Sequence, residues 1–184
     1  MSADHGLTHV SGKNSLIATA SQTVGPFFSF GLTTNVALGR MAGPHTPGER
    51  IRLEIRVIDG AGAPVPDAMV EAWHADKDGT FLFGRQPTDS SGVCAFETVY
   101  PGQPPGAGEA AHVNLCVFMR GLLRHLYTRL YFAGDPSLDT DAVLAAAPPE
   151  RRDTLIAQRD AAVPSTWRFD IHLQGDRETV YFDL

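Results

Sequence analysis

The segment "IRLEIRVID", residues 51–59, decides the fold, because apolar residues alternate with charged ones from residue 51 to residue 57. Successive side chains of a β-strand point to opposite faces, so such alternation predicts a strand with one buried face. The buried face is formed by Ile51, Leu53, Ile55 and Val57. This period of two recurs along the chain from residue 51 onward.

Further strands are predicted in four segments that are separated by dense turn chemistry. They are "MVEAWHAD" (69–76), "VCAFETV" (93–99), "AHVNLCVFM" (111–119) and "RHLYTRLYF" (124–132). Many short strands with frequent turns predict an all-β fold, namely a two-layer β-sandwich.

The two ends of the chain and one internal stretch receive separate predictions. Residues 1–20 are polar and are expected to form a flexible arm, and residues 21–184 a single domain. Residues 138–160 are expected to be helical, with Pro148 and Pro149 in the first turn of a second short helix. Residues 167–184 are expected to form a hairpin around Gly175.

Composition narrows the class of protein. The formal net charge is −6 and no run of Lys or Arg is present, which argues against nucleic acid or an anionic membrane as the main partner. No signal peptide or membrane-spanning apolar run is found. Cys94 and Cys116 lie within apolar strand patterns and are interpreted as reduced, buried thiols. We therefore expect a cytoplasmic protein.

His112 and Asn114 are the first candidate site, because they share one face of the predicted strand 111–119. A His-X-His pair at this spacing would suit a metal, whereas a neutral amide is a weak ligand for a ferric ion. A hydrogen-bonded structural pair is the favoured interpretation. "DKDG" (76–79) lacks the further acidic ligands of a calcium loop and is interpreted as a turn.

Two other segments allow both a structural and a functional interpretation. One face of the strand 124–132 carries His125, Tyr127, Arg129 and Tyr131. Such a face could be solvated, or could form an interface or an anion pocket, because a guanidinium offers paired donors to a carboxylate. "SQTVGPFF" (21–28) is a shaped turn followed by two phenylalanines. It could anchor the N-terminal segment on the sandwich or pack on a partner subunit.

Taken together and in order, these segments resemble the intradiol ring-cleavage dioxygenase family, from Ser21 to Leu184. The resemblance rests on "SQTVGPFF", "VPDAMVEAWHAD", "TVYPG", "AHVNL", "HLYTRLYF", "RRDTLIAQR" and "RFDIHLQGDRETVYFDL". It implies a two-layer β-sandwich and an oxidoreductase. In family members built from homologous α and β chains, the β chain holds non-haem Fe(III) through two tyrosines and two histidines.

The resemblance implies that this chain is the metal-free member of such a pair. His112 matches the first histidine ligand, Asn114 replaces the second, and the tyrosine positions are unmatched. We therefore expect a relic site here, no catalytic residue on this chain alone, and Fe(III) bound by a partner β subunit in a hetero-oligomer of α–β pairs. His74 and His125 are interpreted as structural.

The resemblance also implies a substrate and a set of contact residues. The reaction would insert O2 into protocatechuate to give 3-carboxy-cis,cis-muconate, a step of aromatic catabolism in the β-ketoadipate pathway. Thr23, Gly25 and Pro26 match a wall of the β chain's active site, and Arg129 matches an arginine that faces the substrate carboxylate.

The sequence allows two rival functions. A self-sufficient iron enzyme would use His112 with Tyr127, Tyr131 or another tyrosine, but it lacks the second imidazole. A non-catalytic transthyretin-like binding module would account for "VIDGAGAPVPDAMVEAW" (57–73), but not for "YTRLYF" or "RRDTLIAQR".

Overall fold

The computed structural model describes residues 19–102 and 108–183, so nearly all of the predicted N-terminal arm lies outside the described residues. The strands are β1 Arg50–Ile58, β2 Met69–Ala75, β3 Phe81–Pro87, β4 Val93–Val99, β5 His112–Phe118, β6 Leu126–Phe132, β7 Ile156–Arg159 and β8 Thr166–His172. The helices are α1 Pro26–Leu32, η1 Val36–Gly39, η2 Leu138–Thr140, α2 Ala142–Ala146 and η3 Pro149–Leu155, where η denotes a 3-10 helix.

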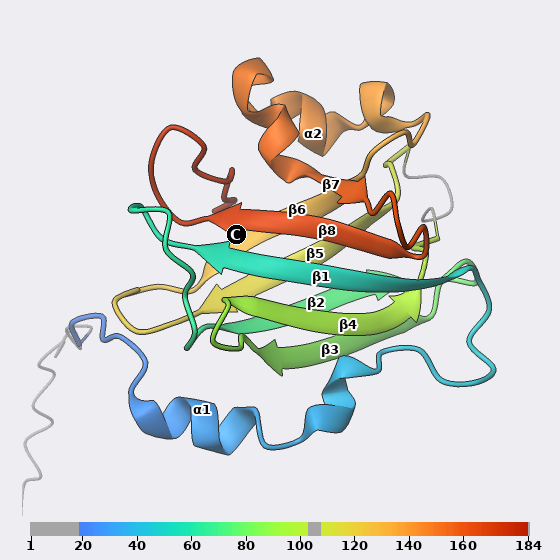
Figure 1. The fold of residues 1–184 in the computed structure, drawn as a ribbon. Coiled ribbons are helices and arrows are strands. Elements are labelled where there is room, and N and C mark those ends of the chain that lie inside the picture. Colours follow the sequence, from blue (N-terminus) through green and yellow to red (C-terminus); the bar gives the residue numbers. More distant parts are fainter. Residues whose placement is uncertain (1–18, 103–107, 184) are drawn as a thin grey trace, which may run out of the picture.

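The strands form one sheet that folds into two layers (Figure 1). Its order is β3-β2-β5-β6-β7-β8-β1-β4, so β4, β1 and β8 make one layer, and β3, β2, β5 and β6 the other. The short strand β7 joins the layers, because it pairs with β6 on one side and with β8 on the other. The predicted two-layer β-sandwich is confirmed.

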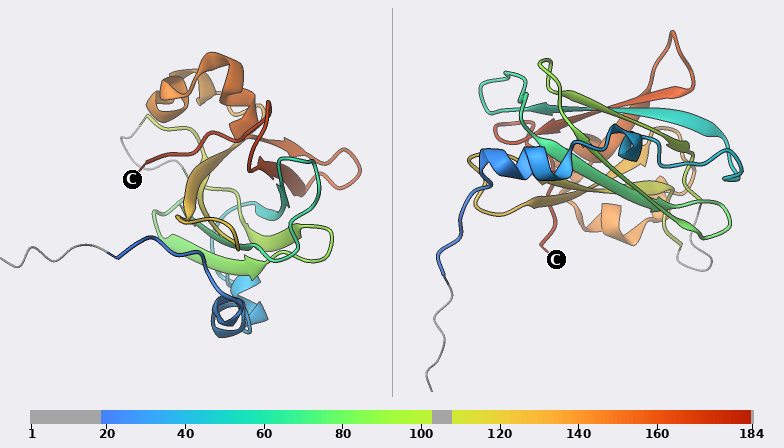
Figure 2. Two further views of the ribbon diagram at one scale, coloured as in Figure 1. Left: turned by 90° about the vertical axis from the view of Figure 1, so that its left-hand side faces the viewer. Right: turned by 90° about the horizontal axis from the view of Figure 1, so that it is seen from below.

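The main core fills the space between the layers with the apolar faces that alternation predicted. Leu53, Ile55 and Val57 of β1 are fully buried, opposite core residues of β5 and β6. Cys94 and Cys116 are free and buried, as predicted, and burial raises the pKa of the Cys116 thiol to about 12. Views at right angles show α1 and α2 on opposite sides of the sandwich (Figure 2).

The prediction of helix over residues 138–160 is correct only in its first part. The stretch forms η2, α2 and η3, and then becomes strand β7 at Ile156. Backbone groups of β6 and β8 at the gap between the layers need partners, and pairing with residues 156–159 supplies them. This tertiary pairing overrides the local helical preference of the segment.

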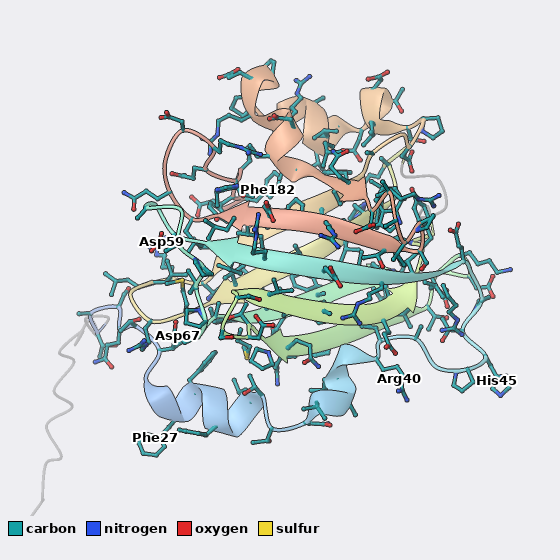
Figure 3. The ribbon with its side chains drawn as sticks, in the orientation of Figure 1. Phe27, Arg40, His45, Asp59, Asp67 and Phe182 are labelled. Carbon is teal, nitrogen blue, oxygen red and sulfur yellow. The ribbon has the colours of Figure 1, made fainter. Side chains whose placement is uncertain are left out.

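The predicted C-terminal hairpin is wrong beyond its turn. Gly175 makes the turn at φ +101°, and the Thr179 N–H donates to the His172 carbonyl at 2.9 Å. The chain then crosses to β6, where Phe182 forms an isolated β-bridge with Tyr127. Phe182 is labelled in Figure 3. Val180 is thereby buried in a second cluster, and this burial favours the crossing over a return strand beside β8.

The second cluster covers the outer face of β6. It joins apolar side chains of α2, η3 and the C-terminal segment to Ala110 and Tyr131, and its buried members are Ala110, Tyr131, Leu144, Ala147, Leu155 and Val180. Tyr131 is completely buried, so the face that carries His125 to Tyr131 is not a uniformly solvated surface.

Candidate functional site

The β5–β6 pairing brings together the residues at which the sequence predicts a relic site. Cross-strand partners are His112 with Tyr131 and Asn114 with Arg129. Val113 lies between His112 and Asn114 in β5 and points into the core. The side chains of His112, Asn114, Arg129 and Tyr131 therefore lie together on the outer face of the sheet.

Arg129 is the centre of this group. Its Nε donates to Asn114 Oδ1 at 3.0 Å, and its Nη1 donates to Glu109 Oε2 at 3.2 Å. The same Glu109 oxygen lies 3.6 Å from His112 Nε2. The Arg129 side chain is only 21% exposed, so its guanidinium is held on several sides rather than presented to solvent.

The two aromatic groups of the site are held in neutral forms. Burial lowers the pKa of His112, and the nearby Arg129 guanidinium adds to this shift. The His112 Nδ1 lies 2.9 Å from the Ala110 carbonyl, which can only accept, so Nδ1 carries the proton. Burial raises the pKa of Tyr131, whose hydroxyl donates to Asp141 Oδ1 at 3.1 Å.

These residues do not fit Fe(III). A ferric ion requires anionic oxygen donors and imidazoles, whereas the site offers one imidazole, a neutral amide and a carboxylate, Glu109, that is already paired with the Arg129 guanidinium. Tyr131 is not free to act as a tyrosinate, because its hydroxyl is bound to the carboxylate that also caps α2. Within residues 19–102 and 108–183, no group of three or more His, Cys, Asp or Glu could hold a metal ion. The self-sufficient iron enzyme therefore lacks a site here.

A second group forms where the N-terminal turn meets the β5–β6 loop. Thr23 Oγ1 accepts a hydrogen bond from the Gly121 N–H at 2.8 Å and donates to the Met119 carbonyl at 3.4 Å. The ring of Phe28 packs on Phe118 with centroids 5.4 Å apart. These contacts anchor the N-terminal segment on the sandwich, one of the two alternatives that the sequence left open.

A hollow of about 170 Å³ lies at this junction. It is lined by Gln22, Val24, Phe28, Phe118, Met119, Leu122, Leu123, Arg124 and His125. Apolar side chains make up most of its wall, and a cation and an imidazole stand at one end. This composition suits a small aromatic molecule or an aromatic side chain of a partner.

The structure brings together only part of the predicted substrate-contact set. Thr23 and Gly25 are exposed at the turn, and a Cβ at Gly25 would meet nothing within 4 Å. Pro26 begins α1, and its side chain is not among those that the structure describes. Arg129 pairs with Asn114, five residues before Met119 along β5, which places it about 16 Å from the turn at 3.3 Å per residue.

Arg120 is an exposed cation beside the turn that the sequence interpretation missed, and Arg124 of the same loop lines the hollow. Arg120 stands between Met119 and Gly121, the two residues that Thr23 binds. Its side chain is 72% exposed and forms an ion pair with Asp67. The sequence contained one signal for Arg120: it directly follows a predicted strand and directly precedes Gly121. In the structure, Gly121 adopts φ +93° in the loop after β5.

The other candidates make structural contacts, and His125 also lines the hollow at the N-terminal turn. His74 is buried, with Nε2 2.7 Å from Thr98 Oγ1 and a pKa lowered by burial. The ring of His125 packs edge-on against Tyr127 at a centroid distance of 4.7 Å. The segment 76–79 is a turn, in which Asp76 accepts two backbone hydrogen bonds at 2.9 Å.

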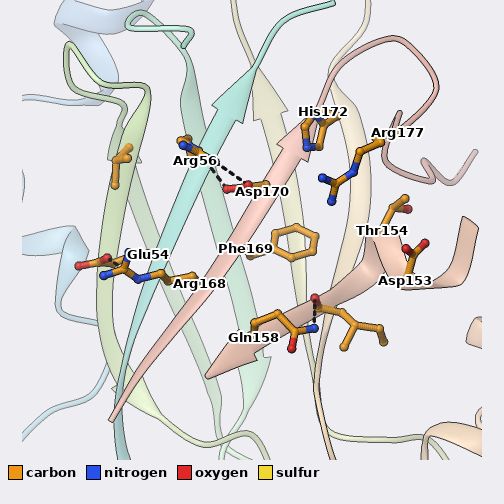
Figure 4. A pocket seen from close by; sticks show the side chains of 12 residues that line it. Glu54, Arg56, Asp153, Thr154, Gln158, Arg168, Phe169, Asp170, His172 and Arg177 are labelled. Atoms are coloured by element: carbon orange, nitrogen blue, oxygen red, sulfur yellow. Dashed lines mark hydrogen bonds and ion pairs between the residues drawn. The ribbon is translucent and has the colours of Figure 1, made fainter. Parts of the chain in front are cut away.

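A larger pocket of about 360 Å³ lies on the outer face of β1 and β8 (Figure 4). Its charges compensate one another: Arg56 donates to Asp170 at 3.0 and 2.7 Å, and Arg168 lies 3.7 Å from Glu54. None of the predicted site residues lines this pocket, so it is separate from the relic site and from the N-terminal turn.

Comparisons with known proteins identify the class. The family model described as Dioxygenase matches residues 23–108. The protocatechuate 3,4-dioxygenase alpha chain of Burkholderia cepacia is 40% identical over 192 residues, which cover 90% of this chain and 97% of that relative. The chain therefore belongs to the intradiol ring-cleaving dioxygenase family, whose members are oxidoreductases that use non-haem iron.

Within this family, the similarity to an alpha chain is greater than that to a beta chain. The beta chain of the Burkholderia cepacia enzyme is 30% identical over 154 residues, covering 70% of this chain and 66% of that relative. The dioxygenase domain of a carbohydrate-binding fusion protein from Streptomyces sp. SirexAA-E has the same fold, with a TM-score of 0.62 and 26% identity over 77% of this chain and 88% of that one. The family resemblance predicted from the sequence is confirmed. No helix in the described part of the chain is long and apolar enough to span a membrane.

Proposed function

We propose that this chain is the α subunit of a protocatechuate 3,4-dioxygenase. In complex with an iron-bearing β subunit, it would take part in the cleavage of protocatechuate by O2 to 3-carboxy-cis,cis-muconate. One observation carries the proposal: the chain is similar to an alpha chain over almost its whole length, yet its own residues do not fit Fe(III). A cytoplasmic location stays a prediction.

In this proposal the chain contributes a wall to the β subunit's active site. Thr23, Gly25 and Pro26 remain the predicted wall, and two observations support it. Thr23 is fixed to the β5–β6 loop by two hydrogen bonds, so the turn has a defined shape. Phe27 at the start of α1 is 85% exposed and points away from the body (Figure 3), as expected of a segment that packs on a partner.

The substrate carboxylate requires a cation, and two arginines are candidates. Arg129 is the one predicted from the sequence, but its donors already bind Glu109 and Asn114. Arg120 stands beside Thr23 with an exposed side chain, and the geometry therefore favours it. A hydrogen bond to a charged group contributes roughly 1.5–3 kcal/mol, or about one to two decades of affinity.

Co-expression tests the proposed function. The chain is purified alone and together with a β-like partner, and protocatechuate-dependent O2 uptake is measured for both. We expect activity only in the co-purified complex. Turnover by the isolated chain, or a β-like partner that is fully active without this chain, would overturn the proposal.

A further inference from the structure

We propose that the guanidinium of Arg129 is the resident cation of the relic site, where it occupies the space of a metal ion and keeps metal ions out. The inference rests on the geometry of this chain and on its family membership. It does not depend on the proposed α-subunit function, and its test needs neither protocatechuate nor a partner.

Three potential metal ligands converge on one place. Glu109 Oε2 and Asn114 Oδ1 lie 3.2 and 3.0 Å from nitrogens of Arg129. His112 Nε2 lies 3.6 Å from the same Glu109 oxygen. Ligand atoms at the usual 2.0–2.2 Å from one metal ion are separated by about 3.4 Å at the tetrahedral angle. The spacing of Glu109 and His112 is therefore close to that of ligands sharing an ion, but the Glu109 oxygen is already paired with the guanidinium.

The orientation of His112 supports the same conclusion. Its Nδ1 proton is directed to the Ala110 carbonyl, so Nε2 carries the lone pair and faces the acid. A backbone carbonyl that binds the second ring nitrogen is the arrangement that orients ligating histidines. His112 thus keeps the geometry of a ligand, while the ion that it could bind is replaced by a side chain.

Charge explains why an ion does not displace the guanidinium. Arg129 is permanently positive, and the site is partly dry, since the side chains of Arg129, Glu109 and His112 are 21%, 27% and 10% exposed. A divalent ion within a few ångströms would be repelled, and more strongly than in water. The charged groups facing the site compensate one another, because Glu109 pairs with Arg129 and Asp141 binds the Tyr131 hydroxyl.

The inference makes Arg129 as important as Asn114 for the metal-free state. An imidazole placed at position 114 would still face the guanidinium, so Asn114→His alone should not create a site. Removing the charge as well would free Glu109 and leave one carboxylate and two imidazoles. That set is sufficient for a first-row divalent ion.

The test measures Co²⁺ binding by calorimetry and visible absorption at pH 7.5. The variants are Asn114→His, Arg129→Gln and the double variant. Arg85→Gln is the matched control, because Arg85 lies on the same sheet layer, is also largely buried, and pairs with Glu71 at 2.6 Å. We expect the double variant to bind one Co²⁺ at least 100-fold more tightly than Asn114→His. The wild-type chain and Arg85→Gln should show no stoichiometric binding.

Equal binding by Asn114→His and the double variant would overturn the inference, because the guanidinium would then not exclude the ion. A folded double variant that binds no Co²⁺ would overturn it as well. If the double variant unfolds without metal, Co²⁺ should restore its circular dichroism spectrum. Failure of Co²⁺ to restore the spectrum would also overturn the inference. Arg129→Lys with Asn114→His should stay metal-free, since the positive charge remains.

Discussion

Arg120 lies in the loop between β5 and β6 and Arg129 on β6, and their surroundings assign them different roles. Arg120 is exposed and has one ion pair, and such surface pairs contribute only about 0–1 kcal/mol, so its guanidinium is available to a ligand. Arg129 is largely buried between Glu109 and Asn114, and its removal would leave both without a partner. The sequence alone did not separate the two, because exposure depends on the fold.

The first prediction concerns substrate binding in the complex with a β-like partner. Arg120→Ala should raise the KM for protocatechuate by about 10- to 100-fold, the effect of losing one charge-assisted hydrogen bond, with iron content unchanged. Arg129→Ala should change KM by less than about threefold on the same reasoning. The opposite result would contradict the geometric assignment and support the prediction made from the sequence.

The second prediction concerns stability. Arg129→Ala should lower the free energy of unfolding of the chain by about 1–3 kcal/mol, because Glu109 and Asn114 would be left partly buried and unpaired. Urea denaturation measures this value. Arg120→Ala is the control and should change it by less than about 1 kcal/mol. Equal effects would show that the internal contacts of Arg129 contribute no more than a surface ion pair.

The third prediction concerns pH. Burial lowers the pKa of His74 in the folded chain below its unfolded value of about 6.5, so the unfolded chain binds more protons as the pH falls. Stability is therefore fully present above pH 6.5 and declines as the pH falls below it, by up to about 1.4 kcal/mol per pH unit. Urea denaturation at pH 7.5 and 5.5 tests this, with His74→Gln as a variant that should lose part of the decline. Greater stability at pH 5.5 would be inconsistent with a buried neutral His74.

At the level of strands and turns, alternation predicted most elements and failed where tertiary pairing decides. β1 and β5 were recognisable because one face is apolar throughout. The strand β7 has four residues, which are too few to show a period-two alternation. It forms because the backbones of β6 and β8 both need a hydrogen-bonding partner. The placement of Thr23 against Gly121 joins residues 98 positions apart, and no local pattern could indicate it.

The fourth prediction concerns this contact. Thr23→Val removes the hydroxyl that accepts from the Gly121 N–H, while Thr23→Ser keeps it. Amide hydrogen exchange at Gly121 should be faster in the valine variant and close to wild type in the serine variant. Unchanged exchange in Thr23→Val would mean that the N-terminal turn is not held to the β5–β6 loop by this side chain.

The molecule as a whole is a complete sandwich with an incomplete site. Its two layers and both apolar clusters are well formed, and the group around His112 and Asn114 is bound by internal contacts. Phe27 and Phe30 of α1 are 85% and 70% exposed, which is unusual for a chain that acts alone and is in keeping with a partner at this face. The structure and the comparisons thus favour a subunit over a self-sufficient enzyme.

Iron stoichiometry tests the central claim most directly. The chain is co-purified with a β-like partner, and iron is measured per α–β pair alongside the isolated chain. We expect one iron per pair and none in the isolated chain, because the relic site has one imidazole and its Glu109 carboxylate is paired with the guanidinium of Arg129. Two irons per pair, or iron in the isolated chain, would contradict the account of a subunit that completes another chain's site.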